Sequence, residues 1–422
     1  MSQPSSTPFP STGGFVEAVR SSSRSLRQRA NITITEDSIK RILLSPAFTD
    51  TFARLKTAHG MVLPLNFPSV LAELNVLCIL SLLNFASGYR VPLHVASGRG
   101  AFDTIRALIF SMFITSDTEG DHLSAKGMQT ITEGQVADFM GLANKVHEEK
   151  DHDEIPGVKI GQLGGPVWEL VQLVTMVMKE TGDILVKNGY QNLGAFVVEA
   201  LEKGEKEAKG DPERMCDFVL ERFIRAFPAF QDMTTVQGEP VYCFKKALLT
   251  LHAIVLRFGS LSPAPFPIPQ TTNLPVFSDN VIPSLLIHLG VIDLSTSNPS
   301  YRLNTLFPDS QNKEKLDSLL AAAPLHRDER ESQHITPPKE GPLLTTEQAF
   351  TLRAAAIDAC ELIVETAKKL TDDDLKQSDG KDLGWLKNIT LPEIDAWIWA
   401  VAKDRSDYRQ LERFALRNTV YF

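Results

Sequence analysis

The chain has 422 residues, of which 43% are hydrophobic and 23% are charged, and its formal net charge is -9 at pH 7. This length allows two or three domains, and the composition is typical of a globular protein with a sizeable core. Phosphate backbones repel an acidic protein, so the charge argues against general binding to nucleic acid polymers. A small anionic ligand is still allowed, because a local group of basic residues can outweigh the net charge.

The four cysteines are far apart in the sequence, and none of them forms a CxxC pair. This spacing favours buried free thiols in a reducing compartment over a zinc site or a disulfide framework. The longest apolar run, residues 74–86, is interrupted by polar residues and is too short to span a bilayer. We therefore expect a cytoplasmic protein with no metal, no cofactor and no membrane partner.

The N-terminal third is predicted to be helical after a disordered start. Residues 1–14 are rich in Ser, Pro, Gly and Thr, which is typical of disorder. Helices are expected from Phe15 and from Glu36, the second with Thr35 as its N-cap. Residues 69–85 are apolar on nearly every face, which predicts a helix that is buried on all sides.

The middle of the chain continues the helical pattern. A capping sequence at Thr132 introduces an amphipathic helix, and residues 147–154 read as an acidic loop. The expected helices that follow cover residues 167–188, 193–201, 212–226 and 241–258.

The C-terminal third contains the least regular segments. Five prolines exclude a regular helix from residues 259–275, and the polar residues 322–343 are expected to be a flexible insert. Helical spacing returns at 346–370 and at 391–403. No run alternates long enough to indicate a strand, so the sequence predicts a single all-α domain over residues 15–422.

Two motifs resemble a metal site and a phosphate-binding loop but are better explained as structural features. His147 and His152 are five residues apart, whereas four would place both on one helix face for a metal, so a charged loop is favoured. Gly98-Arg99-Gly100 lacks the strand and the Lys-Ser/Thr of a phosphate loop, which favours a turn. Trp397 and Trp399 are interpreted as packing residues on different sides of a helix.

Lys245 and Asp279 are the strongest candidates for chemistry. Lys245 begins an apolar run and lies near its buried face, although a solvated lysine is an alternative. Asp279 precedes a helix that carries Pro283 in its first turn, so an N-cap role is the alternative there.

Four stretches in order resemble the queuosine salvage family, which hydrolyses queuosine 5'-phosphate to free queuine. They are residues 179–186, residues 227–247 with Phe-Pro-Ala-Phe-Gln-Asp and Cys-Phe-Lys-Lys-Ala, residues 277–291 with Phe-Ser-Asp-Asn-Val-Ile-Pro, and the C-terminal segments 352–362, 398–404 and 420–422.

The resemblance implies an all-helical fold similar in outline to helical DNA glycosylases, a nucleotide substrate and no cofactor. It places the essential lysine and aspartate of the family on Lys245 and Asp279. Further substrate-binding residues that the resemblance implies are Phe244, Phe277, Asp232 and Arg353, with Asn84 and Phe85 retained from the family pattern near residue 85.

Chemistry supports an aspartate in this role. Breaking an N-glycosidic bond builds positive charge on the ribose, and a nearby carboxylate stabilises that charge and can deprotonate the attacking water. Lys245 could hold the carboxylate, bind the 5'-phosphate or assist the leaving base. Queuine is a 7-deazaguanine and lacks the N7 that glycosylases often protonate.

The chain also departs from the family pattern. Ser81 replaces an acid and Ser87-Gly88 replace an aromatic pair, with Phe102 among the residues that could compensate. Arg90, Arg99 and Arg106 are phosphate-binding candidates in this stretch. The departures leave a non-catalytic nucleotide-binding protein on the same fold as an alternative. Excision of DNA bases is disfavoured by the acidic charge.

Overall fold

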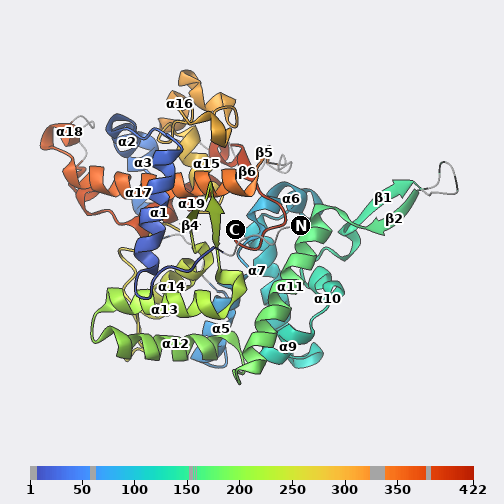
Figure 1. Cartoon of the computed structure of the whole chain (residues 1–422). Helices are drawn as coiled ribbons and strands as arrows, with labels where there is room; N and C mark the ends of the chain where they lie inside the picture. Colours follow the sequence, from blue (N-terminus) through green and yellow to red (C-terminus); the bar gives the residue numbers. More distant parts are fainter. Residues whose placement is uncertain are drawn as a thin grey trace.

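The computed structural model describes residues 7–57, 63–151, 155, 157, 159–323, 338–376 and 382–422. Most of these residues are helical, as predicted (Figure 1). The first half contains α1 Phe15–Arg29, α2 Glu36–Leu43, α3 Pro46–Thr49, α4 Phe52–Leu55, α5 Val70–Leu82, η1 Ala86–Tyr89, α6 Arg90–Ser97, α7 Ala101–Ile114, α8 Ser116–Glu119, α9 Ala125–Thr130, α10 Glu133–Phe139, η2 Ala143–Lys145, β1 His147–Asp151, β2 Lys159–Leu163, α11 Gly165–Lys187 and α12 Leu193–Ala208. The second half contains α13 Pro212–Ala226, η3 Pro228–Phe230, β3 Met233–Val236, β4 Glu239–Tyr242, α14 Lys245–Phe258, α15 Val281–His288, η4 Pro299–Tyr301, η5 Pro308–Gln311, α16 Lys313–Leu320, β5 Glu340–Leu343, α17 Thr346–Lys369, α18 Asp372–Lys376, η6 Gly384–Asn388, α19 Leu391–Asp404, α20 Ser406–Arg409 and β6 Arg413–Ala415.

The centre of the molecule is built from helices that are buried on most faces. In α5 every residue from Leu74 to Leu82 is buried, as its all-round apolar sequence predicted, and α12 and α14 pack against it. All four cysteines are free and buried. Among the described residues no single helix is long and apolar enough to cross a bilayer. Within the same residues one pair of helices, Val70–Leu82 and Ala86–Ser97, would be long and apolar enough together, but the two are bent by 61° relative to each other.

The helix starts follow the capping residues in the sequence. The hydroxyl groups of Thr35 and Thr132 accept hydrogen bonds from the backbone N–H groups of Ser38 and Gln135, and each pair completes a capping box. These contacts satisfy donors that a helix leaves open at its first turn. Both predicted caps are therefore confirmed.

The prediction of disorder for the N-terminus is wrong for residues 7–14. Thr12 donates to Glu221, the backbone N–H of Gly13 contacts the same carboxylate, and Tyr242 donates to the carbonyl oxygen of Pro8. These polar contacts hold a segment whose composition alone suggests disorder. Residues 1–6 lie outside the described residues.

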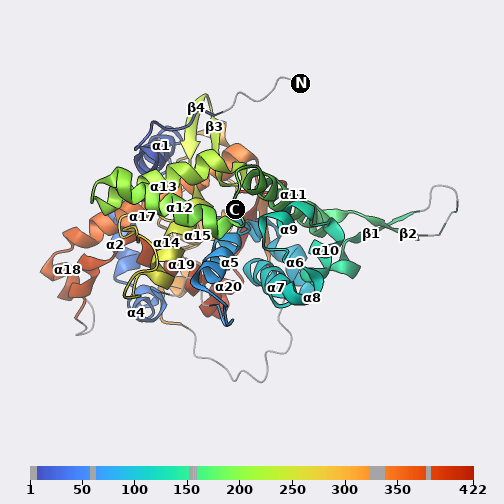
Figure 2. The ribbon, with the colours of Figure 1, turned by 90° about the horizontal axis from the view of Figure 1, so that it is seen from below.

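The prediction that the chain has no strands is also wrong in three places. The expected acidic loop at 147–154 instead begins with β1, which pairs antiparallel with β2 in a hairpin that projects from the helical body (Figures 1 and 2). All ten strand residues of this hairpin are exposed, so no apolar alternation marks it in the sequence.

The second hairpin, β3–β4, changes the start of a predicted helix. Met233 lies opposite Tyr242, so Val241 and Tyr242 belong to a strand, and α14 begins only at Lys245. Phe244 adopts a left-handed conformation with φ of 48° between the strand and the helix. This turn places Lys245 in the first turn of α14.

The third pair, β5–β6, lies partly within the predicted flexible insert. Residues 324–337 lie outside the described residues, but residues 340–343 form a parallel strand beside β6, with Glu340 opposite Arg413. The insert is therefore shorter than the predicted 322–343. The likeness in outline to helical DNA glycosylases stays a prediction.

A buried ion pair joins the segments that approach the centre of the fold. Arg353 of α17 donates through two nitrogens to both carboxylate oxygens of Asp232, at 2.8 and 2.5 Å. The same carboxylate accepts the backbone N–H of Lys245, and Arg353 also donates to the carbonyl oxygen of Ser278. The pair thus fixes the start of α14 and the loop before α15 to each other.

Replacing Asp232 by Asn should destabilise the protein strongly. The change leaves the Arg353 guanidinium charged and buried without its counter-ion, and such a change costs about 3–5 kcal/mol. The measurement is the free energy of unfolding in urea. Removing Lys159, whose ion pair with Glu149 is exposed on the hairpin, is the control and should change stability by less than about 1 kcal/mol. Equal losses from both variants would contradict the role of the buried pair.

Candidate active site

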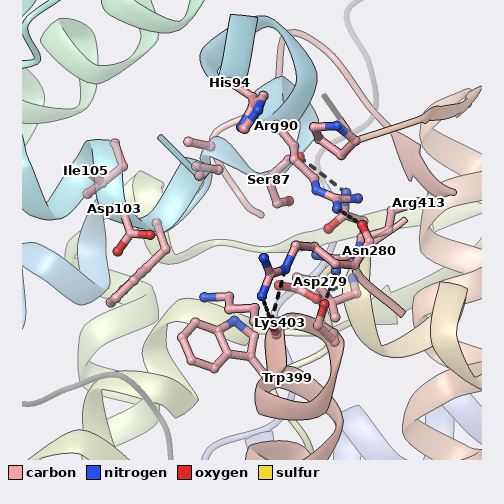
Figure 3. A pocket seen from close by; sticks show the side chains of 18 of the residues that line it. Ser87, Arg90, His94, Asp103, Ile105, Asp279, Asn280, Trp399, Lys403 and Arg413 are labelled. Atoms are coloured by element: carbon pink, nitrogen blue, oxygen red, sulfur yellow. Dashed lines mark hydrogen bonds between the residues drawn. The ribbon is translucent and has the colours of Figure 1, made fainter. Parts of the chain in front are cut away.

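A cavity of about 310 Å³ lies between two walls that come from distant parts of the sequence (Figure 3). One wall is formed by the segment from Asn84 to Ile105, which includes η1, α6 and the start of α7. The other wall combines the loop before α15, the end of α19 and residues 409–413. A volume of this size suits a small-molecule ligand.

Asp279 is one of the residues that line the cavity, and it is 6% exposed. Its Oδ1 accepts the backbone N–H of Val281 at 2.6 Å, so it satisfies a donor in the first turn of α15. The N-cap residue of α15 is Asn280, so the predicted N-cap role of Asp279 is wrong, although its carboxylate binds the start of the helix from within the cavity lining. Within the described part of the chain Oδ2 has no hydrogen-bond partner, which leaves one oxygen for a ligand.

Lys245 lies directly behind the cavity wall. It is 3% exposed, so the alternative of a solvated lysine is wrong. Its Nζ donates to the backbone oxygen of Asn84 at 2.5 Å and to the side-chain oxygen of Asn84 at 3.1 Å. Burial lowers the pKa of Lys245 to about 8, and the negative charge of Asp279 opposes this shift. No direct ion pair joins Lys245 to Asp279 among the described residues.

The other residues implied by the resemblance divide into two groups. Asn84 lines the cavity, with its amide oxygen on Lys245. The remaining five are buried residues outside the cavity lining, and they support the loop and the helix that carry Asp279 and Lys245: Phe85, Phe244, Phe277, Asp232 and Arg353.

The two departures from the family pattern have different structural consequences. Ser81 is fully buried in α5, and its hydroxyl donates to the carbonyl oxygen of Leu77. A Cβ at Gly88 would lie 2.3 Å from the carbonyl oxygen of Leu416, so the C-terminal segment fills the space that a side chain there would need. Ser87 remains in the cavity lining, where it leaves room that an aromatic ring would take.

Three arginines at the cavity donate only to backbone oxygens. Arg90 contacts the carbonyl of Arg409 at 2.5 Å, Arg409 contacts that of Lys403 at 2.7 Å, and Arg413 contacts that of Ala402 at 2.8 Å. Among the described residues none of these guanidinium groups reaches a carboxylate. We refer to Arg90, Arg409 and Arg413 as the arginine cluster.

The arginine cluster carries positive charge that no ion pair in the described structure neutralises, although the negative charge of Asp279 acts on Arg413. Burial lowers the pKa of Arg413 to about 9 and that of Arg90 to about 10, and a neighbouring guanidinium acts in the same direction in each case. The Nε of Arg413 is buried without a partner in the part of the chain described. An anion in the cavity would supply both the missing charge and the missing acceptor.

The sequence identified only one member of this cluster. Of the three arginines predicted to bind phosphate, Arg90 lines the cavity, whereas Arg106 lies outside the lining and pairs with Asp103 at 2.9 Å. Arg99 is also outside the lining and contacts the carbonyl oxygen of Met140. Arg409 and Arg413 were missed, because no local pattern marks residues that a C-terminal strand brings to a distant helix.

Trp399 was missed as a cavity residue. It packs edge-on against Phe102 with ring centroids 5.6 Å apart, as a packing residue would, and it also lines the cavity, which the sequence analysis did not predict. Trp397 is buried and donates to the hydroxyl of Thr51, as a packing residue would. Lys403 lies one turn after Trp399, and this i, i+4 pair is the signal that could have identified the wall.

Asp395 of α19 holds the loop that carries Asp279. It accepts the backbone N–H of Phe277 at 2.6 Å and is 5% exposed. Burial raises the pKa of Asp395 to about 7; the hydrogen bond from Phe277 opposes the shift, and the negative charge of Asp279 adds to it.

The described residues contain no group of three or more His, Cys, Asp or Glu side chains placed to hold a metal ion. His147 lies in β1, and His152 is outside the described residues.

The comparison with protein families matches one part of the chain. Residues 165–308 match the family model described as queuosine salvage protein. This segment is therefore similar to the queuosine salvage proteins. It contains Lys245 and Asp279, whereas Asn84, the arginine cluster and Trp399 come from residues outside it. A search of curated proteins found no match to the chain.

Replacing Asp395 by Asn should change how stability depends on pH. Because the folded protein raises the pKa of Asp395 from 3.8 to about 7, this group stabilises the fold below about pH 4 and loses that contribution as the pH rises to 7. Asn can still accept the hydrogen bond from Phe277 but does not titrate. Urea unfolding from pH 4 to 8 should show the variant gaining stability relative to wild type over this interval. Parallel curves would contradict the raised pKa.

Proposed function

We propose that the chain hydrolyses the N-glycosidic bond of a nucleoside 5'-monophosphate, with queuosine 5'-phosphate as the substrate and queuine as the released base. The match of residues 165–308 to the queuosine salvage family model supports a nucleotide-type ligand. The observation that carries the proposal is the position of Asp279, a carboxylate with one open oxygen in the same cavity as the arginine cluster.

Asp279 provides the charge that this reaction needs. As the bond between C1' and the base stretches, positive charge builds on the ribose, and a carboxylate held close to the ribose stabilises that charge. The open oxygen can also accept a proton from the water that attacks C1'. The hydrogen bond from Val281 fixes the other oxygen and therefore the direction of the carboxylate.

The arginine cluster suits the 5'-phosphate. Its guanidinium groups are held by backbone carbonyls, so they are oriented before a ligand arrives. Arginine binds phosphate with paired, charge-assisted hydrogen bonds. A phosphate bound here would place the ribose between the cluster and Asp279.

Lys245 is assigned a supporting role in this scheme. Its amine donates twice to Asn84, which lines the cavity, and it lies within electrostatic reach of Asp279. The positive charge of Lys245 behind the wall attracts the carboxylate of Asp279. This assignment differs from direct anchoring of the carboxylate, since the two side chains form no ion pair in the described structure.

Asp279→Asn should lower the turnover of queuosine 5'-phosphate by about a hundredfold or more, which corresponds to about 3 kcal/mol of transition-state stabilisation. Asn keeps the acceptor for Val281 and removes the charge. The measurement is queuine release followed by chromatography.

Asp293→Asn is the matched control for Asp279→Asn. Asp293 accepts a backbone N–H two residues ahead in the same way, but it lies outside the cavity lining. Its replacement should leave turnover unchanged. A wild-type protein that is stabilised against heat by the nucleotide without cleaving it would support the non-catalytic alternative instead.

Arg409→Gln should weaken binding of the nucleotide by about tenfold or more, because a hydrogen bond between charged groups contributes about 1.5–3 kcal/mol. Binding of the nucleoside without phosphate should hardly change, and calorimetry with both ligands measures the difference. Arg106→Gln, outside the cavity lining, is the control. Equal weakening of both ligands would contradict a phosphate site at the arginine cluster.

A further inference from the structure

One basic group in the cavity has no role in the scheme above. Lys403 comes from the last turn of α19, and its side chain extends past Trp399 toward the wall that carries Asp103 (Figure 3). Its Nζ lies 3.1 Å from the centroid of the Trp399 ring and 5.3 Å from that of Phe102. Within the described residues this amine makes no hydrogen bond and no ion pair. It is therefore held by aromatic faces and is free to interact with a ligand.

The surroundings of Lys403 make its proton easy to release. Burial lowers the pKa of Lys403 to about 7, so the amine changes its charge near neutral pH. The charged groups around it oppose one another: two carboxylates favour the ammonium form, and two guanidinium groups disfavour it. These groups are Asp103 and Arg106 of α7, Asp279 before α15 and Arg413 of β6.

The proposed reaction needs such a group on the side of the leaving base. When the C1'–N bond breaks, its electron pair moves to the base, and a proton delivered to the base makes it a better leaving group. Most purines can take this proton at N7, but a 7-deazapurine has carbon there and no lone pair. The proton has to reach another nitrogen of the base, from a donor that touches it.

We propose that Lys403 is the general acid that protonates the departing base. This inference rests on the proposed hydrolase function. The C1'–N bond breaks with its electron pair on the base, the ammonium of Lys403 gives a proton to a ring nitrogen, water forms the new bond to C1', and the proton of that water passes to Asp279. Lys403 ends neutral and Asp279 ends protonated, and exchange with solvent restores both groups.

The test compares two substrates that share the ribose phosphate and differ in whether their leaving group needs an acid. Queuosine 5'-phosphate has a base that leaves poorly, whereas 4-nitrophenyl riboside 5-phosphate releases 4-nitrophenolate without protonation. Lys403→Met should lower kcat by about a hundredfold on the first substrate. It should change kcat by no more than a few-fold on the second. Equal loss on both substrates would overturn the acid role and leave the hydrolase proposal standing.

Lys403→Arg is the matched control for charge. Arginine keeps the positive charge over Trp399 but holds its proton too tightly to donate it, so it should be as inactive as Met on queuosine 5'-phosphate. Rescue by arginine would show that Lys403 supplies charge alone, and would overturn the proposal.

The pH profile gives a second readout. An acid must carry its proton, so turnover of queuosine 5'-phosphate by wild type should fall as the pH rises above about 7, and turnover of the nitrophenyl substrate should not. A profile that is the same for both substrates would contradict the proposal. If wild type cleaves neither substrate, the hydrolase function and the acid role are both refuted.

Discussion

The buried ion pair between Asp232 and Arg353 is the interaction on which the geometry of the site depends. A carboxylate and a guanidinium without access to water must satisfy each other and use their remaining hydrogen-bonding capacity nearby. Here Asp232 accepts the backbone N–H of Lys245, and Arg353 donates to the backbone oxygen of Ser278, the residue before Asp279. The phenyl rings of Phe350 and Phe422 cover the guanidinium group at 5.0 and 4.2 Å. The two candidate residues of the matched family segment are thus positioned by charges that never touch the cavity.

The arginine cluster in the cavity has no carboxylate partner among the described residues. Buried cations normally have counter-ions, yet the buried guanidinium group of Arg413 donates to a backbone carbonyl, which neutralises little charge. The cavity lining holds more basic than acidic side chains, in contrast to the net charge of -9 on the whole chain. The electrostatic potential near the cavity, rather than the net charge of the chain, determines whether a small charged ligand is attracted. The acidic remainder of the surface would repel polyanions, while a single phosphate group can still enter.

Structural features that depend on residues close together in the sequence could be predicted, whereas features that depend on tertiary contacts could not. Capping boxes at Thr35 and Thr132 and the all-round apolar pattern of α5 act over one or two helical turns, and the sequence revealed them. Lys245 and Asp279 could be proposed as site residues because contiguous segments resemble a known family. Arg413 and Trp399 could not, since they reach the cavity only through the packing of α19 and the pairing of β5 with β6. The start of α14 was misplaced because Val241 and Tyr242 are apolar enough for either a strand or a buried helix.

The walls of the cavity are also far apart in the sequence, since the contact from Arg90 to the backbone of Arg409 spans 319 residues. Closing such a long loop is slow, so contacts of this kind form late in folding. A partly folded chain can therefore contain α5 and the helices around it while it still lacks a binding site. A ligand that contacts both walls binds only the folded state. Its binding therefore shifts the folding equilibrium toward that state by mass action. Binding of such a ligand therefore indicates that the chain has folded completely.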